Sequence, residues 1–175
     1  MSAPITIDVH AHLLPEEAIR LLGKESPRVA PKLIDENGAL IMEIAGKVVQ
    51  RPMPREIFDL DLRLRDMDQH GVAMQLVCAT IQTFFYDEEP ALGAACAALQ
   101  NDEIAAVAKR NPEHFLALAT LPMQDPAKAA DELARAMTML GLRGAQIGSN
   151  INGRNLDDPA LEPVWSVANR LKATG

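Results

Sequence analysis

The sequence predicts an α/β fold in which a parallel sheet is covered by helices. Two observations lead to this prediction: apolar segments of strand length alternate with segments of helical periodicity, and the strand segments are apolar almost throughout. Nearly continuous apolar strands are typical of parallel sheets, because helices cover both of their faces. With 175 residues, the chain is long enough for one domain with a sizeable core.

Four segments have the character of strands. The first ends at a pair of histidines, and the others are short apolar runs bounded by glycine, proline or polar residues. The predicted strands are residues 4–9, 72–80, 115–121 and 144–148.

Helical segments lie between and after these strands, and their ends carry recognisable signals. Gly71 stops the first helix, Asn111 and Pro112 close the second, and Asp125 with Pro126 begins the third. The predicted helices are residues 59–69, 89–110, 127–140 and 158–172.

One region departs from this alternation. Residues 25–55 contain four prolines, and the stretch GALIMEIAGKVVQR alternates around an Ala-Gly-Lys turn. We therefore expect a small antiparallel hairpin at about 25–55, inserted after the first strand.

Four strand–helix units fit two architectures. They can close a flavodoxin-like sheet, or they can be half of a (β/α)₈ barrel, which typically needs about 250 residues. The chain stops at a helix end with no strand after it. We therefore expect an incomplete barrel with an unpaired edge at residues 144–148, and a self-standing four-unit domain is the alternative.

Charge and composition exclude some partners. The net charge is −7, and no run is rich in lysine and arginine, which argues against nucleic acid or an anionic membrane surface as a partner. A small anionic substrate needs only one or two arginines and stays compatible. Cys78 and Cys96 lie in apolar or alanine-rich segments and indicate buried thiols in a reducing compartment. With neither a signal peptide nor a membrane-length apolar run recognisable, we expect a cytoplasmic protein.

The most informative residues are His10 and His12, at the end of the first strand. Residues two apart in a strand share a face, with Cα atoms roughly 6.6 Å apart, so both imidazoles can reach one cation such as zinc. A chance pattern is the alternative. We interpret Asp8 as a supporting group on the opposite face, and His70 and His114 as structural residues.

The opening IDVHAHLLP resembles the metal-dependent amidohydrolase superfamily, whose first strand ends in His-x-His. The similarity extends to the decarboxylase branch typified by amino-carboxymuconate-semialdehyde decarboxylase and the resorcylate decarboxylases. The matching pieces are Gln50-Arg51-Pro52, RLRDMDQHGVAMQLVCAT, NPEHFLALATLPMQDPAKAADEL and GLRGAQIGSNINGRNLDDPALEPVW.

The resemblance implies a (β/α)₈ TIM barrel of the amidohydrolase type, of which residues 1–175 are the N-terminal part with about the first four units. It implies one divalent metal ion, usually zinc, with His10 and His12 as two ligands. The other ligands and the proton-transfer histidine would follow later strands, beyond Gly175, so no catalytic residue is assigned. Arg51 would hold a substrate carboxylate, with a solvated loop arginine as the alternative.

The function that follows from the resemblance is a metal-dependent decarboxylase, a carbon–carbon lyase. Its substrate would be a small unsaturated or aromatic carboxylic acid. A metal-dependent hydrolase of an amide or lactone is the first alternative, and a non-catalytic truncated barrel fragment is the second. We expect a homo-oligomer, a dimer. Phe84, Phe85 and Tyr86 follow the second strand and either line the pocket or pack beneath a loop.

Overall fold

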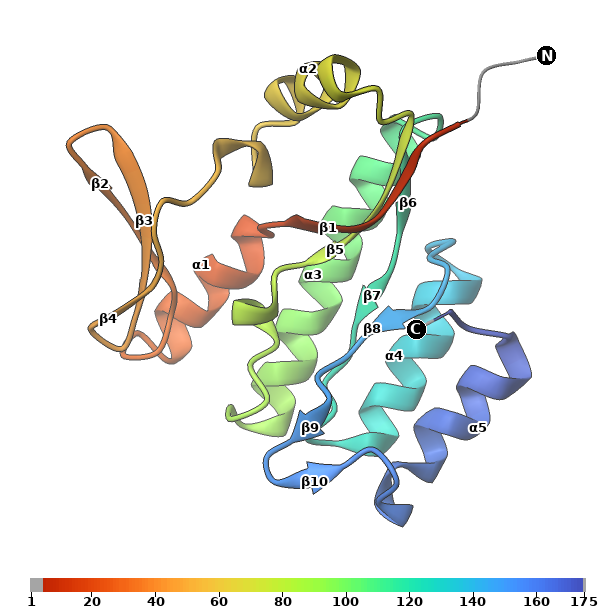
Figure 1. Ribbon diagram of the computed structural model, residues 1–175. Helices are drawn as coiled ribbons and strands as arrows, with labels where there is room; N and C mark the ends of the chain where they lie inside the picture. The colour runs from red at the N-terminus through yellow and green to blue at the C-terminus, as the bar shows by residue number, and fades with distance from the viewer. Residues whose placement is uncertain (1–4, 175) are drawn as a thin grey trace.

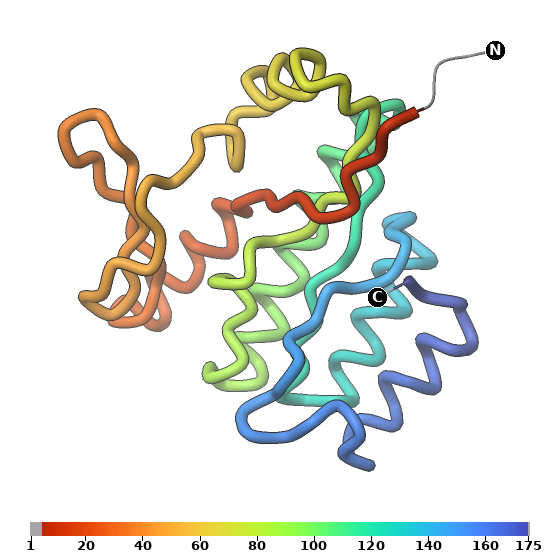
Figure 2. Tube along the Cα trace, in the orientation of Figure 1, coloured from red at the N-terminus to blue at the C-terminus, as the bar shows by residue number. Residues whose placement is uncertain are grey.

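The computed structural model describes residues 5–174 and confirms the parallel α/β order (Figure 1). β1 pairs with β5 and β5 with β6, while β7 pairs with β8, and all of these pairs are parallel. Only Leu118 separates β6 from β7, so the two form one bent segment that runs beside β5 (Figure 2). The strands are β1 (Ile7–Leu13), β5 (Met74–Ala79), β6 (Phe115–Ala117), β7 (Ala119–Thr120) and β8 (Ala145–Gln146).

The first strand differs from the prediction. It was expected at residues 4–9 with the histidines at its end, but β1 runs from Ile7 to Leu13 and contains both histidines. The expected start at Pro4 lies outside the described residues. β1 continues because its last residues still pair with β5, with His12 opposite Cys78 and Leu13 opposite Ala79.

The predicted helices are present, although α4 ends at Thr138 rather than at 140, and a 3-10 turn replaces the start of the helix predicted at 158. Asp59 caps α2 by accepting the N–H of Leu62 at 2.9 Å, and Gly71 ends it in the left-handed conformation at φ 66°. Asp125 caps α4 in the same way. The helices are α2 (Leu60–His70), α3 (Pro90–Arg110), α4 (Pro126–Thr138) and α5 (Glu162–Leu171), the last preceded by the 3-10 turn η3 (Pro159–Leu161).

A further helix, α1 (Glu16–Glu25), was not predicted. Pro15 at its N-cap has no side-chain oxygen to accept the first N–H groups. Glu103 of α3 supplies that acceptor, taking the N–H of Glu16 at 3.1 Å and of Glu17 at 2.9 Å. Because this cap comes from a residue far along the chain, no local signal marks the start of α1.

The inserted region forms a three-stranded antiparallel sheet rather than the expected two-stranded hairpin. β3 (Ala39–Ile44) and β4 (Lys47–Gln50) are the predicted pair, and β2 (Lys32–Glu36) adds a strand. Asn37 and Gly38 join β2 to β3 with φ values of 57° and 85°, which is the usual backbone of a tight Asn-Gly hairpin turn. The 3-10 turn η1 (Arg55–Ile57) then leads the chain to α2.

One face of the parallel sheet is packed against helices. Alternate strand residues are buried there together with α3 and α4 side chains such as Ile104 and Leu133. These strand residues are Ala11, Leu13, Val77, Ala79, Phe115 and Ala117. Within residues 5–174, no helix is both long enough and apolar enough to cross a membrane.

The edge expected to be unpaired at residues 144–148 has a partner at its first residues. The N–H of Ala145 donates to the carbonyl of Thr174 at 3.0 Å, and the N–H of Thr174 donates to the carbonyl of Arg143 at 3.0 Å. Gly144 and Thr174 form a parallel bridge. These contacts cover only the start of the expected edge, where the chain turns back beside β8 directly after α5.

Candidate metal centre

The two histidines lie in the second half of β1, beside a bulge. Asp8 pairs with Gln75 and Ala11 with Val77, so three residues of β1 span two of β5. Strict alternation would place Asp8 on the face of both histidines. The extra residue instead puts Asp8 in register with Ala11, on the face opposite His12; the expected face is thus due to the bulge and did not follow from the alternation in the sequence.

The imidazoles of His10 and His12 converge. Their Nε2 atoms are 3.1 Å apart, and the ring centroids are 4.8 Å apart with planes at 87°. Two nitrogens that each bind one ion at about 2.05 Å, at an angle of about 90–109°, are about 2.9–3.4 Å apart. The observed separation therefore fits a shared divalent metal ion.

His12 is held in the form that a metal needs. Its Nδ1 lies 3.2 Å from the carbonyl oxygen of Ala79, which can only accept a hydrogen. Nδ1 therefore carries the hydrogen, and the lone pair remains on Nε2, which faces His10. Burial lowers the pKa of His12 and outweighs the contact with the Ala79 carbonyl, which raises it, so the structure favours the uncharged ring that a metal requires.

A buried arginine supports this end of β1 from behind. Arg63 of α2 donates Nη2–H to the carbonyl of His12 at 2.5 Å and Nη1–H to Oε1 of Gln75 at 2.9 Å. Gln75 in turn donates to Oδ2 of Asp8 at 3.0 Å, and Oδ1 of Asp8 accepts the backbone N–H of His10 at 3.0 Å. The sequence analysis missed Arg63, although its position three residues after Leu60 and four before Met67 places it on the apolar face of α2.

The described residues do not complete a metal shell. Among residues 5–174, no group of three His, Cys, Asp or Glu side chains is placed to hold an ion. Cys78 lies 3.4 Å from Nδ1 of His12, but burial raises the pKa of its thiol to about 12, so it stays protonated. His70 is at the end of α2 against Asp66, and His114 is beside the carbonyl of Ala73, as structural residues would be.

Arg51 is not brought to the histidines. It lies directly after β4 and forms an ion pair with Glu36 of β2 at 2.8 Å. Its side chain is 53% exposed. Gln50 and Met53, which lie next to Arg51 in the sequence, line the cavity beside His12, whereas Arg51 does not.

Two adjoining hollows open at the carboxyl end of the sheet. One, of about 420 Å³, is lined by His12 and Arg63; the other, of about 720 Å³, is lined by Phe84 and Tyr86. Both also contain Ile81 and Gln82, which follow β5. The aromatic side chains therefore line a hollow that adjoins the one beside His12.

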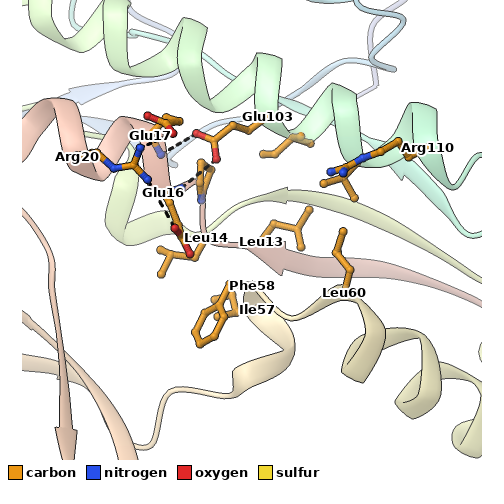
Figure 3. A pocket seen from close by; sticks show the side chains of 13 residues that line it. Leu13, Leu14, Glu16, Glu17, Arg20, Ile57, Phe58, Leu60, Glu103 and Arg110 are labelled. Carbon is orange, nitrogen blue, oxygen red and sulfur yellow. Dashed lines mark hydrogen bonds and ion pairs between the residues drawn. The ribbon is translucent and has the colours of Figure 1, made fainter.

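A third cavity, of about 220 Å³, lies between α1, α3 and η1 (Figure 3). Leu13, Ile57 and Phe58 contribute apolar walls. The carboxylate of Glu103 at its rim points to the start of α1, where it accepts the two N–H groups described above. Because that carboxylate already serves as the helix cap, the hollow beside His12 is the better candidate site.

Comparisons with known proteins agree with this geometry. A family model described as "Amidohydrolase" matches residues 7–174. The 2-amino-3-carboxymuconate-6-semialdehyde decarboxylase of Dictyostelium discoideum is 35% identical over 170 residues, which cover 97% of this chain and 47% of the relative. The chain thus spans about half the length of the curated relatives it matches.

Solved structures give the same result for the fold. The 5-carboxyvanillate decarboxylase of Sphingomonas paucimobilis has a TM-score of 0.77 at 25% identity, covering 98% of this chain and 51% of that one. The enzyme of the same name from Novosphingobium aromaticivorans, solved with manganese and 4-hydroxy-3-methoxy-5-nitrobenzoic acid, has a TM-score of 0.76 at 23% identity, covering 97% and 48%. With residues 7–174 matched, this chain belongs to the amidohydrolase family.

Proposed function

We propose that the protein to which this chain belongs is a metal-dependent decarboxylase of small aromatic or unsaturated carboxylic acids. The observation that carries the proposal is the pair of Nε2 atoms, 3.1 Å apart, in a chain 35% identical to a decarboxylase. His10 and His12 would hold one divalent metal ion. We keep zinc as the proposed metal, and manganese in a structurally similar decarboxylase supports a divalent ion of this size.

When bound, the metal ion would polarise the substrate and draw charge from the carbanion that forms as CO₂ leaves. The residues of this chain would orient the reactants. The Ala79 carbonyl fixes the ring of His12, and the hollow with Phe84 and Tyr86 offers apolar walls to a planar ring. Walls that exclude water around a bound substrate would strengthen its electrostatic contacts.

Arg51 is proposed to bind a substrate carboxylate. Its guanidinium already pairs with the carboxylate of Glu36, which supports its capacity to bind such a group. A substrate would have to replace Glu36 in this exposed ion pair, and exposed pairs contribute only about 0–1 kcal/mol. The exchange is therefore energetically small.

The proposal has a structural part as well. The chain would form the N-terminal part of a (β/α)₈ barrel, with the inserted sheet at residues 32–50. The parallel bridge of Thr174 to Gly144 supports a further strand beside β8, and the relatives' greater length supports the same proposal. We further propose a homodimer and a cytoplasmic location; the two buried, unpaired cysteines support a reducing compartment.

The test is an assay of CO₂ release by the metal-loaded protein from hydroxybenzoates and unsaturated acids, beside ester, lactone and amide substrates. Arg51→Ala should leave the metal in place and lower kcat/KM about 10- to 150-fold, the loss of a hydrogen bond to a charged group. Arg51→Lys should restore only part, since it lacks the planar fork.

Arg55→Ala is the matched control. Arg55 is also exposed, belongs to the same region and lies near Asp35 at 3.9 Å, so its loss should leave kcat/KM unchanged. Hydrolysis without CO₂ release would move the function to the hydrolase alternative. If the protein shows no turnover and binds no metal, the non-catalytic alternative holds. Equal effects of the Arg51 and Arg55 variants would remove Arg51 from the site.

A further inference from the structure

Arg63 is a charged residue in an unusual place. Only 8% of it is exposed, and it lies on the face of α2 that also carries the buried Met67. Burial of a charge is costly, and buried arginines normally pair with carboxylates. Within residues 5–174, no carboxylate lies within ion-pair distance of Arg63. The carboxylates of Glu56, Asp8 and Asp66 act on it only from beyond that distance, and uncharged acceptors bind its nitrogens.

The contacts of Arg63 reach both sides of the β1 bulge. Its Nη2–H binds the carbonyl of His12, and its Nη1–H binds Gln75. Through Gln75 the contact continues to Asp8, which accepts the N–H of His10. One guanidinium is therefore connected to the backbone of both histidines.

Among residues 5–174, the sheet offers no second partner to the carbonyl of His12. The next carbonyl, of Leu13, accepts from the N–H of Thr80 on the β5 side at 3.0 Å. Because successive carbonyls of a strand point to opposite sides, that of His12 points away from β5. Arg63 fills this position, and its Nε–H is fixed by the carbonyl of Glu56 at 2.7 Å.

We propose that Arg63 is a positioning residue for the candidate metal centre, which fixes the bulged end of β1 so that the imidazoles of His10 and His12 converge. This inference rests on the proposed function. Arg63 touches neither imidazole and binds no metal; it sets the backbone from which both rings project. Partners that orient metal ligands typically change metal affinity 10- to 100-fold when they are removed.

The test compares Arg63→Met and Arg63→Lys with Arg135→Met and Arg135→Lys. Arg135 is a matched control: it also donates from all three guanidinium nitrogens and joins α3 to α4, away from the histidines. Circular dichroism and thermal unfolding establish that each variant is folded. Titration of the metal-free proteins with Zn²⁺ and with Mn²⁺ then gives the metal affinity.

We expect Arg63→Met to bind metal about 10- to 100-fold more weakly than wild type. The metal affinity of Arg63→Lys should lie between those of Arg63→Met and wild type. A lysine keeps the charge but cannot reach His12, Gln75 and Glu56 at once. The Arg135 variants should lose thermal stability and keep the wild-type metal affinity. If Arg63→Met does not fold, the Lys variant decides, and wild-type affinity in a folded Arg63→Lys would overturn the inference.

A second readout does not depend on metal. The ring centroids of His10 and His12, 4.8 Å apart, should give a nuclear Overhauser contact between ring protons in the metal-free protein. We expect it in wild type and in the Arg135 variants, and its loss in the Arg63 variants. Its persistence in folded Arg63 variants would overturn the inference, whereas a wild type with this contact and no metal affinity would overturn only the proposed function.

Discussion

Removal of either imidazole should abolish tight metal binding, and this is the most direct test of the candidate site. A structural zinc site binds with about 10–16 kcal/mol in total, so one of four ligands carries about 2.5–4 kcal/mol. His10→Ala and His12→Ala should therefore each weaken Zn²⁺ binding by about two to three orders of magnitude. The chain has four histidines, and His70→Ala and His114→Ala are the matched controls, because they remove an imidazole elsewhere.

The structure also predicts that the two substitutions differ in stability. His10 is exposed, and exposed substitutions change the free energy of unfolding by about 0.5 kcal/mol or less. His12 is half-buried, and its loss leaves the carbonyl of Ala79 without that donor, which costs about 1–3 kcal/mol. The metal effect should thus be similar for both variants and the stability effect unequal.

Calorimetric titration of chelator-treated protein with Zn²⁺ measures the first effect, and urea unfolding without metal measures the second. Metal affinities of His10→Ala and His12→Ala that match those of the two control variants would refute the site. A larger stability loss in His10→Ala than in His12→Ala would refute the described environment of His12.

Three further predictions concern the supporting structure. Asn101→Ala should lower the free energy of unfolding by about 2–5 kcal/mol in urea titrations, because the fully buried amide satisfies both the N–H (2.7 Å) and the carbonyl (2.9 Å) of Thr120. Burial raises the pKa of Glu103, so the folded state holds the proton more tightly than the unfolded chain; wild type should gain stability relative to Glu103→Gln as the pH falls from 7 to 5. Burial also raises the pKa of Cys78 to about 12 and of Cys96 to about 11, so a thiol reagent at pH 8 should modify both only after unfolding.

Local signals in the sequence predicted much of the fold. Asp59, Gly71 and Asp125 act through bonds within three or four residues, and they mark the ends of α2 and α4 where expected. The start of α1 depends on Glu103, 87 residues after Glu16, and a pattern read along the chain cannot detect it. Elements whose caps are local were therefore predictable, and the element capped from a distance was not.

The candidate site divides in the same way. The spacing of His10 and His12 is a local pattern, and the structure brings the two rings together. The ion pair of Arg51 with Glu36 depends on how β2 lies beside the end of β4, which the sequence analysis did not include as a strand. Because β2 was not predicted, its residue Glu36 could not be predicted as the partner of Arg51.

The bulge in β1 shows why alternation alone describes this site incompletely. A regular strand would put Asp8 beside the histidines as a third potential ligand; the extra residue turns it to the other face, where it binds Gln75 and the backbone of His10. His10 lies in the bulge, where Asp8 accepts its backbone N–H, and the carbonyl of His12, on the side of β1 away from β5, accepts from Arg63. Asp8 and Arg63, which satisfy these backbone groups, are therefore also the residues proposed to fix the direction of the two imidazoles. In other sequences, such support can be sought as an arginine on the apolar face of a helix that comes after a His-x-His strand.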